Sequence, residues 1–306
     1  MQDLHGLPKL RDSLSYLYVE HAVIEQAGHA IELWQKDGRT LVPAASLCVL
    51  MLGPGTKITH AAVKVLADNG CTMLWTGEEM TKFYAQGLGE TRKAYHLLQQ
   101  AELACNPVKH TRVCIRMYQK RFTETLDPSL TLPQIRGFEG VRVRRAYKEA
   151  SQKYGVQWNG RNYDRFNWGG GDPINRALSA ANATLNSLCH AAIVSGGYSP
   201  AIGFVHTGKQ LSFVYDIADL YKADFTIPIA FSVAAESNQN IERRVRMACR
   251  EKFREIKLLE RILPDIDDIL EVKDEPINDL LDVDADPALP TNLWPDTIHE
   301  GDPAPC

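Results

Sequence analysis

Apolar and polar residues alternate through the first part of the chain, which is the pattern of half-buried β-strands. Asp37-Gly38 follows one such segment and predicts a hairpin turn, because Asp-Gly accepts the positive φ of a tight turn. Residues 47–52 form a continuous apolar run, as expected for a buried strand, and residues 59–69 have the period of one helix. The other expected strands are 15–19, 22–26, 30–35, 71–76 and 82–86. Together these segments predict a β-rich domain over residues 1–88.

From about Glu90 the apolar positions recur with a helical period. Asp172-Pro173 is a strong helix start, with Asp as the N-cap and Pro at the first helical position, and Gly196-Gly197 ends that helix. The expected helices are 92–123 (interrupted at Asn106-Pro107), 133–154, 172–196, 212–224 and 240–262. The predicted fold class is therefore α+β, with a β-rich domain over 1–88, a larger all-helical domain over 89–280 and an acidic, proline-rich, flexible tail over 281–306.

The net charge of −4 conceals an uneven distribution of charge along the chain. Residues 262–306 hold 13 acidic residues, one lysine and seven of the 16 prolines, so this end is expected to be loose or ordered only on binding. The first 261 residues hold 33 basic and 25 acidic side chains. A basic body fits a polyanionic partner. A solvated acidic tail is the alternative explanation, and composition alone favours it.

Cysteine usage and hydropathy indicate a soluble, cytoplasmic protein. The seven cysteines are scattered without a Cys-x-x-Cys pair, which gives no zinc framework, and their odd number fits reduced thiols. No run approaches the roughly 18 apolar residues of a membrane span. The first residues also lack the basic-then-apolar pattern of a signal peptide.

Candidate catalytic residues lie in three separate segments. Glu139 lies in an otherwise basic expected helix, and His206 lies between glycines beyond a helix end. Asp216 and Asp219 are three residues apart, so they share a helical face. Each also has an ordinary explanation, because Glu139 can pair with a neighbouring arginine, His206 can be a hydrogen-bonded loop residue, and Asp219 can pair with Lys222.

Taken together, two carboxylates and an imidazole suit Mg²⁺ or Mn²⁺ better than structural zinc, which favours Cys and His. The spacing alone does not show that the three segments converge.

Five segments of the sequence closely resemble the universal CRISPR-associated integrase, the first protein of the spacer-acquisition pair, in its subtype I-E version. The resemblance covers nearly the whole chain. Its longest and most specific part is Ser199-Pro-Ala-Ile-Gly-Phe-Val-His-Thr-Gly-Lys209 together with residues 211–219. The other segments are Leu50-Met-Leu-Gly-Pro-Gly-Thr56, Arg136-Gly-x-Glu-Gly140 and Trp158-Asn-Gly-Arg-x-Tyr-Asp164.

The resemblance implies an N-terminal β-sandwich joined to a helical domain that holds one catalytic metal ion. Glu139, His206 and Asp219 match the metal ligands of the family, and Asp216 matches an additional acidic position close to the metal. The implied reaction joins the 3′-hydroxyl of a prespacer DNA to a phosphodiester at the CRISPR repeat, with DNA nuclease activity besides. The implied assembly is a homodimer that works with a small second Cas protein.

Basic residues on several elements are candidates for DNA contact. Lys57 and Lys82 match basic positions of the family, whereas His21 stands where relatives can carry a fork-splitting tyrosine. Lys209 and Lys222 are placed to neutralise phosphate charge.

The expected helix 240–262 is also basic, with eight Arg or Lys against four Glu over residues 240–261. We expect Arg243, Arg246 and Arg250 to contact phosphates, the alternative being a surface helix with i,i+4 ion pairs. Tyr163 and Trp168 bracket a loop and are expected to stack on unpaired bases, although Trp168 fits a core position as well.

Two further hypotheses remain open at this level. One is a DNA-binding scaffold of the same fold with an idle metal site. The other is a metal-dependent hydrolase of small phosphoesters, against which the long basic helices argue.

Overall fold

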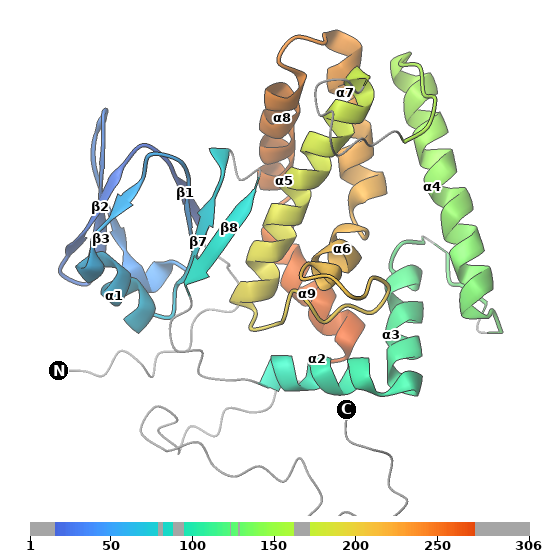
Figure 1. Ribbon diagram of the computed structural model, residues 1–306, viewed down its shortest axis with the longest axis horizontal. Coiled ribbons are helices and arrows are strands. Elements are labelled where there is room, and N and C mark those ends of the chain that lie inside the picture. The colour runs from blue at the N-terminus through green and yellow to red at the C-terminus, as the bar shows by residue number, and fades with distance from the viewer. Residues whose placement is uncertain are drawn as a thin grey trace, which may run out of the picture.

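The computed structural model describes residues 16–78, 82–87, 95–122, 124–127, 129–161 and 172–272. Two β-sheets form one side of the molecule, and the helices after residue 95 form the other (Figure 1). The predicted α+β class is confirmed for the described residues. The expected acidic tail at 281–306 and the boundary at 88/89 lie outside them, as do Tyr163 and Trp168.

The N-terminal part is a sandwich of two four-stranded sheets. The first sheet has the order β1 (Tyr16–Val19), β5 (Val49–Leu52), β7 (Thr72–Thr76) and β8 (Phe83–Gly87); β1, β5 and β7 are parallel, and β8 is antiparallel to β7. The second sheet has the order β4 (Gly38–Pro43), β3 (Ala30–Gln35), β2 (Val23–Ala27) and β6 (Lys57–Ile58). Between β5 and β7 the chain forms α1 (His60–Asp68), which contacts β2, β3 and β7. The β4 and β6 strands were not predicted.

The apolar run of β5 is buried on both faces, as its sequence predicts. Leu50 and Leu52 point into the sandwich core with Ile24 and Ile31 of the second sheet. Val49 and Met51 point the other way and pack with Ala191 of the long helix α5 (Pro173–Ser195). Because side chains alternate across a strand, one strand thus belongs to the core of each half of the molecule.

Eight α-helices follow residue 95 within the described ranges. They are α2 (Tyr95–Cys105), α3 (Pro107–Gln119), α4 (Leu132–Tyr154), α5, α6 (Ser212–Ala218), α7 (Ile227–Glu236), α8 (Ile241–Glu255) and α9 (Leu258–Leu270), with a π-helical turn η4 (Lys222–Thr226) before α7. The Asp172 side chain caps α5 by accepting from the Asn175 N–H at 2.8 Å, as predicted. At the end of α4, Gly155 has a φ of +66°, which favours glycine and ends the helix.

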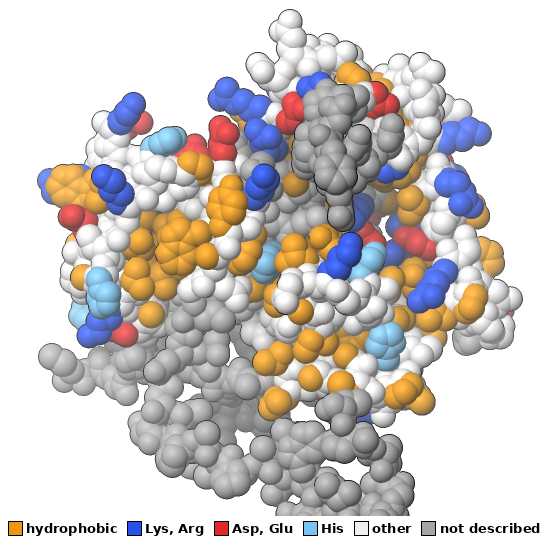
Figure 2. All heavy atoms as spheres, in the orientation of Figure 1, with side chains coloured by type: hydrophobic (Ala, Val, Ile, Leu, Met, Phe, Trp, Pro, Cys, Tyr) orange, Lys and Arg blue, Asp and Glu red, His pale blue; other side chains and the backbone are white. Residues whose placement is uncertain are grey.

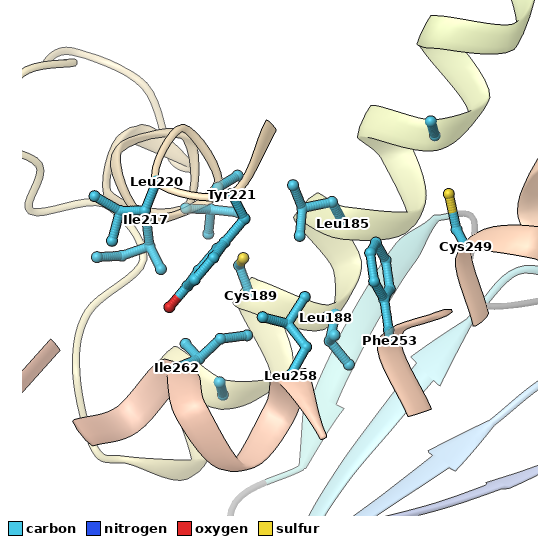
Figure 3. Close-up of a cluster of buried hydrophobic side chains, with 14 of the residues drawn as sticks. Leu185, Leu188, Cys189, Ile217, Leu220, Tyr221, Cys249, Phe253, Leu258 and Ile262 are labelled. Atoms are coloured by element: carbon cyan, nitrogen blue, oxygen red, sulfur yellow. The ribbon is translucent and has the colours of Figure 1, made fainter. Parts of the chain in front are cut away.

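Helix α5 is the centre of the helical part, with α6, α7, α8, α9 and β7 in contact with it (Figure 1). Most of its residues are buried, including several polar ones, as expected for a helix surrounded by other elements. Figure 3 shows Leu185, Leu188 and Cys189 of α5 meeting Phe253 of α8 and Ile262 of α9 in one cluster. This core fixes the position of α6, which carries the candidate residue Asp216 and ends at a C-cap that is the candidate residue Asp219.

Three predictions about the later helices were wrong. The expected helix 212–224 ends at Ala218, and the expected helix 240–262 is divided into α8 and α9 at Lys257, whose φ is +49°. Helix α7 was missed because Pro228 argues against a helix interior, but Pro228 lies in the first turn, where its missing N–H costs nothing.

The first part of the acidic C-terminal region is not loose, because α9 continues to Leu270 and buries one face. Its acidic residues act as partners of other helices. Asp265 accepts from the Tyr221 hydroxyl at 2.6 Å, and Asp267 accepts from the Tyr198 hydroxyl at 2.6 Å.

Within the part of the chain that the structure describes, none of the helices combines the length and the apolar character needed to span a bilayer.

The contact between the sheets and α5 predicts a stability that depends on pH. His190 is buried and stacks on Phe83 of β8 at 3.8 Å, and burial lowers the pKa of His190 to about 4. The unfolded chain binds this proton below about pH 6.5 while the folded chain does not. The contribution of His190 to the free energy of unfolding is therefore fully present above pH 6.5, and it falls by about 3 kcal/mol as the pH drops to 4. Urea unfolding from pH 7 to pH 4 should show this loss, and His190→Gln should reduce the slope.

Candidate functional site

A buried carboxylate organises the candidate site. Asp216 of α6 has no exposed surface and accepts hydrogen bonds from the backbone N–H groups of Phe204, Val205 and His206, at 2.6, 3.1 and 2.8 Å. The His206 Nδ1 lies 2.7 Å from the same carboxylate. Because Asp216 does not reach solvent, it is a residue that positions His206 and not a group that touches substrate.

The loop before His206 is closely folded. A Cβ added to Gly203 would lie 2.1 Å from the His206 carbonyl oxygen and 2.8 Å from the Ser212 Cβ, so this position requires glycine. The N–H of Phe213 donates to the Pro200 carbonyl at 2.9 Å and holds the start of α6 to the start of the loop. The loop therefore has little freedom, and His206 projects from a fixed backbone.

His206 and Asp219 lie together at the surface. The His206 Nε2 is 3.9 Å from a carboxylate oxygen of Asp219, and the two side chains are 43% and 23% exposed. The hydrogen bond to Asp216 raises the pKa of His206, burial lowers it, and the charge of Asp219 raises it further. Lys222 donates to Asp219 at 2.6 Å, as the ordinary explanation for Asp219 predicted.

Glu139 of α4 is nearly buried and is bound by two arginines. Arg142 donates to it from Nε at 2.8 Å and from Nη2 at 3.2 Å. Arg121, which follows α3, contacts the carboxylate from Nη1 at 3.4 Å and the Asp216 carbonyl from Nη2 at 3.5 Å. One guanidinium therefore connects Glu139 to the segment that holds Asp216 and His206.

The three expected metal ligands are only partly assembled. Among the described residues, no three His, Cys, Asp or Glu side chains form a group that could hold an ion. The donor chemistry nevertheless fits a hard cation, since His206 and Asp219 are adjacent and the Asp216 carboxylate fixes the other nitrogen of His206, as is usual for metal-bound histidines. Glu139, the third expected ligand, is instead paired with Arg142 and Arg121.

The arginines of α8 have different surroundings. Arg243 is exposed, whereas Arg246 and Arg250 are half-buried. The Nε of Arg246 is buried and has no hydrogen-bond partner among the described residues. The Arg250 guanidinium lies 5.1 Å from the centre of the Tyr18 ring, which ties α8 to the first sheet. Arg243 is thus the residue of this set best exposed to a ligand.

The candidate lysines are exposed and dispersed. Lys57, Lys82 and Lys209 are exposed, and only Lys222 lies beside the candidate ligands. On the face of the molecule drawn in Figure 2, the basic side chains of the described residues are scattered and do not form one continuous patch.

Two residues around Glu139 were missed as parts of the site. Arg142 was foreseen only as an ordinary helix partner of Glu139. Arg121 is 18 positions away from Glu139, and no local pattern in the sequence indicates such a contact.

The buried carboxylate predicts unequal effects of two similar substitutions, one on α6 and one at its C-cap. Asp216→Asn leaves an amide facing four donors, and the lost charge-assisted hydrogen bonds should cost about 3 kcal/mol of unfolding free energy. Asp219→Asn, one turn further on and partly exposed, should cost less than about 1 kcal/mol. Urea unfolding of both variants measures this difference, and equal losses would contradict the role given to Asp216.

Comparisons with known proteins agree on one family. The family model for CRISPR associated protein Cas1 matches residues 114–244, which contain Glu139, His206, Asp216 and Asp219. A CRISPR-associated endonuclease Cas1 of Thermus thermophilus is 54% identical over 298 residues, covering 96% of this chain and 90% of the relative. The CRISPR-associated endonuclease Cas1 of Escherichia coli is 42% identical over 268 residues, covering 87% of this chain and 88% of the relative.

Solved structures match as well. A crystal structure of a TtCas1–DNA complex has a TM-score of 0.79 and 56% identity and covers 87% of this chain and 100% of that chain. A casposase bound to integration product shares the fold at a TM-score of 0.57 and 13% identity, covering 85% of this chain and 92% of that one. On the length and identity of these matches, the chain belongs to the CRISPR-associated Cas1 family.

Proposed function

We propose that this chain is a metal-dependent DNA integrase and endonuclease of CRISPR spacer acquisition. It would join the 3′-hydroxyl of a prespacer to a phosphodiester of the CRISPR repeat and would also cut DNA. The observation that carries the proposal is the His206–Asp219 pair, held by buried Asp216, in a chain of the Cas1 family. The names of the relatives, which call them endonucleases, support the nuclease part of the proposal.

The residues of the site have separate tasks in this reaction. His206, Asp219 and Glu139 would hold Mg²⁺ or Mn²⁺. When bound, such an ion polarises a phosphoryl oxygen and assists loss of the proton from the attacking hydroxyl. Asp216 keeps the His206 Nε2 directed outward by binding its Nδ1. Lys222 adds positive charge beside Asp219 for the phosphate that enters.

DNA would be held through its phosphates, since spacer sequences are arbitrary. Exposed Arg243 and Lys209 fit this role, and Lys57 and Lys82 would extend it to the β domain. The similar solved structure of a TtCas1–DNA complex supports DNA as the ligand. Assignment to subtype I-E, the cytoplasmic location, the homodimer and the small second Cas protein stay predictions that rest on the sequence.

A DNA-binding scaffold with an idle metal site is the alternative, and one observation favours it. Glu139 is already paired with Arg121 and Arg142, and a DNA-binding scaffold would keep both ion pairs permanently. A divalent-dependent joining assay separates the two functions, because a scaffold binds DNA without joining it.

Substitution of the expected ligands should separate chemistry from binding. Glu139→Ala, His206→Ala or Asp219→Ala should each lower the rate of joining a 3′-hydroxyl oligonucleotide to a repeat plasmid by more than about 100-fold, because the loss of a direct ligand exceeds the loss of a supporting one. DNA affinity should change by less than about threefold, because phosphate contacts are made elsewhere. The assay supplies Mg²⁺ or Mn²⁺ and the partner protein. Full activity of these variants in EDTA would refute the metal assignment.

Exposed Arg243 should contribute one phosphate contact. Arg243→Ala should weaken DNA binding and reduce the slope of log affinity against log salt by about one. Lys252→Ala is the matched control on the same helix, because Lys252 is paired with Glu255 at 2.8 Å. Binding isotherms at several salt concentrations provide the measurement, and identical slopes for Arg243→Ala and the unaltered chain would remove Arg243 from the DNA interface.

A further inference from the structure

Two arginines bind the Glu139 carboxylate in different ways. Arg142 makes a two-point contact, with Nε at 2.8 Å and Nη2 at 3.2 Å, so both carboxylate oxygens are engaged. Arg121 makes one longer contact at 3.4 Å. The Glu139 carboxylate therefore has two cationic partners in the place where the proposed function requires a third ligand.

The two arginines also differ in freedom. The Arg121 side chain is only 3% exposed, contacts the Asp216 carbonyl, and lies over the Tyr118 ring at 5.0 Å. Arg142 is 23% exposed, stands one turn after Glu139 on the same helix and lies 5.8 Å from the centre of the Phe122 ring. Arg121 is fixed by its surroundings, whereas Arg142 can rotate outward into water while α4 stays in place.

Resting on the proposed function, we propose that Arg142 is a displaceable cation that competes with the divalent ion for Glu139. Arg142 and Arg121 together use three of the roughly four lone-pair sites of the Glu139 carboxylate, and a guanidinium cation beside it also repels a divalent ion. Binding of the ion therefore requires that Arg142 leave Glu139, while Arg121 keeps this carboxylate near the Asp216–His206 segment. Arg142 sets the affinity of the site for its ion, and Arg121 is a positioning residue.

This competition has two consequences that a purely structural ion pair would not have. Removal of Arg142 strengthens ion binding, because the ion no longer has to break the pair. The same change lowers the stability of the metal-free chain, because Glu139 loses its main partner in a mostly buried place. Once the ion is bound, Arg142 no longer holds Glu139, so the stability difference closes.

The test is a calorimetric titration of the full chain with Mn²⁺ alone. The Mn²⁺ affinities of the variants are then compared. Arg142→Gln should bind Mn²⁺ about tenfold more tightly than the unaltered chain, which corresponds to about 1.4 kcal/mol. Arg142→Lys keeps the charge without the two-point contact, so its Mn²⁺ affinity should lie between those of Arg142→Gln and the unaltered chain. Arg145→Gln is the matched control, because Arg145 lies on the same helix, 77% exposed, and pairs with Glu149; its affinity should equal that of the unaltered chain.

Thermal unfolding provides the second measurement. In EDTA, Arg142→Gln should melt several degrees below the unaltered chain, and saturating Mn²⁺ should remove this difference. Equal or weaker Mn²⁺ binding by Arg142→Gln, or a difference in melting temperature that persists in Mn²⁺, would overturn the proposal.

A Glu139→Gln variant distinguishes failure of this inference from failure of the proposed function. Mn²⁺ binding that is lost in Glu139→Gln but insensitive to Arg142 leaves the metal site in place and overturns only the competition. Binding that is the same in the unaltered chain and in Glu139→Gln, or absent from both, overturns the metal role of Glu139 and the competition with it.

Discussion

The candidate site depends on one buried negative charge. The Asp216 carboxylate has three backbone N–H donors and the His206 ring around it, which is enough to stabilise a charge away from water. The same four contacts shape the loop that carries His206 and fix the direction of its ring. Asp219, the C-cap residue of α6, then lies beside His206 at the surface. Loop conformation, orientation of His206 and its pairing with Asp219 thus share a single cause.

Much of the fold could be predicted from local pattern. The strand periods, the capping of α5 by Asp172 and the doubly buried β5 follow from rules that act within a few residues. The division at Lys257 could not be predicted, because a lysine with positive φ has no sequence signal and results from packing of α9 on the core. Helix α7 was hidden by Pro228, whose effect depends on its exact position in the turn.

The candidate site shows the same limit. The spacing of Asp216 and Asp219 correctly placed them one turn apart, although Asp219 lies at the C-cap of α6, and only the structure shows that Asp216 is buried and Asp219 is partly exposed. The contact of Arg121 with Glu139 and with the Asp216 carbonyl joins three elements far apart in sequence. A contact between residues so far apart leaves no periodic pattern in the sequence, so neither composition nor spacing indicates it. The sequence motifs indicated the candidate residues, and tertiary packing decides which of their side chains are exposed and which are paired.

The distribution of charge also has a different meaning in the structure than in the sequence. The excess of basic residues before position 262 includes Arg116, Lys120, Arg142 and Arg176, each of which is already paired with a carboxylate. Part of the acidic excess after that position lies in α9, where Asp265 and Asp268 neutralise Lys120. Charges paired in this way contribute little field beyond about 10 Å at moderate salt. Attraction of a polyanion would therefore come from exposed cations without such partners, for example Arg243, and their positions matter more for it than the net charge does.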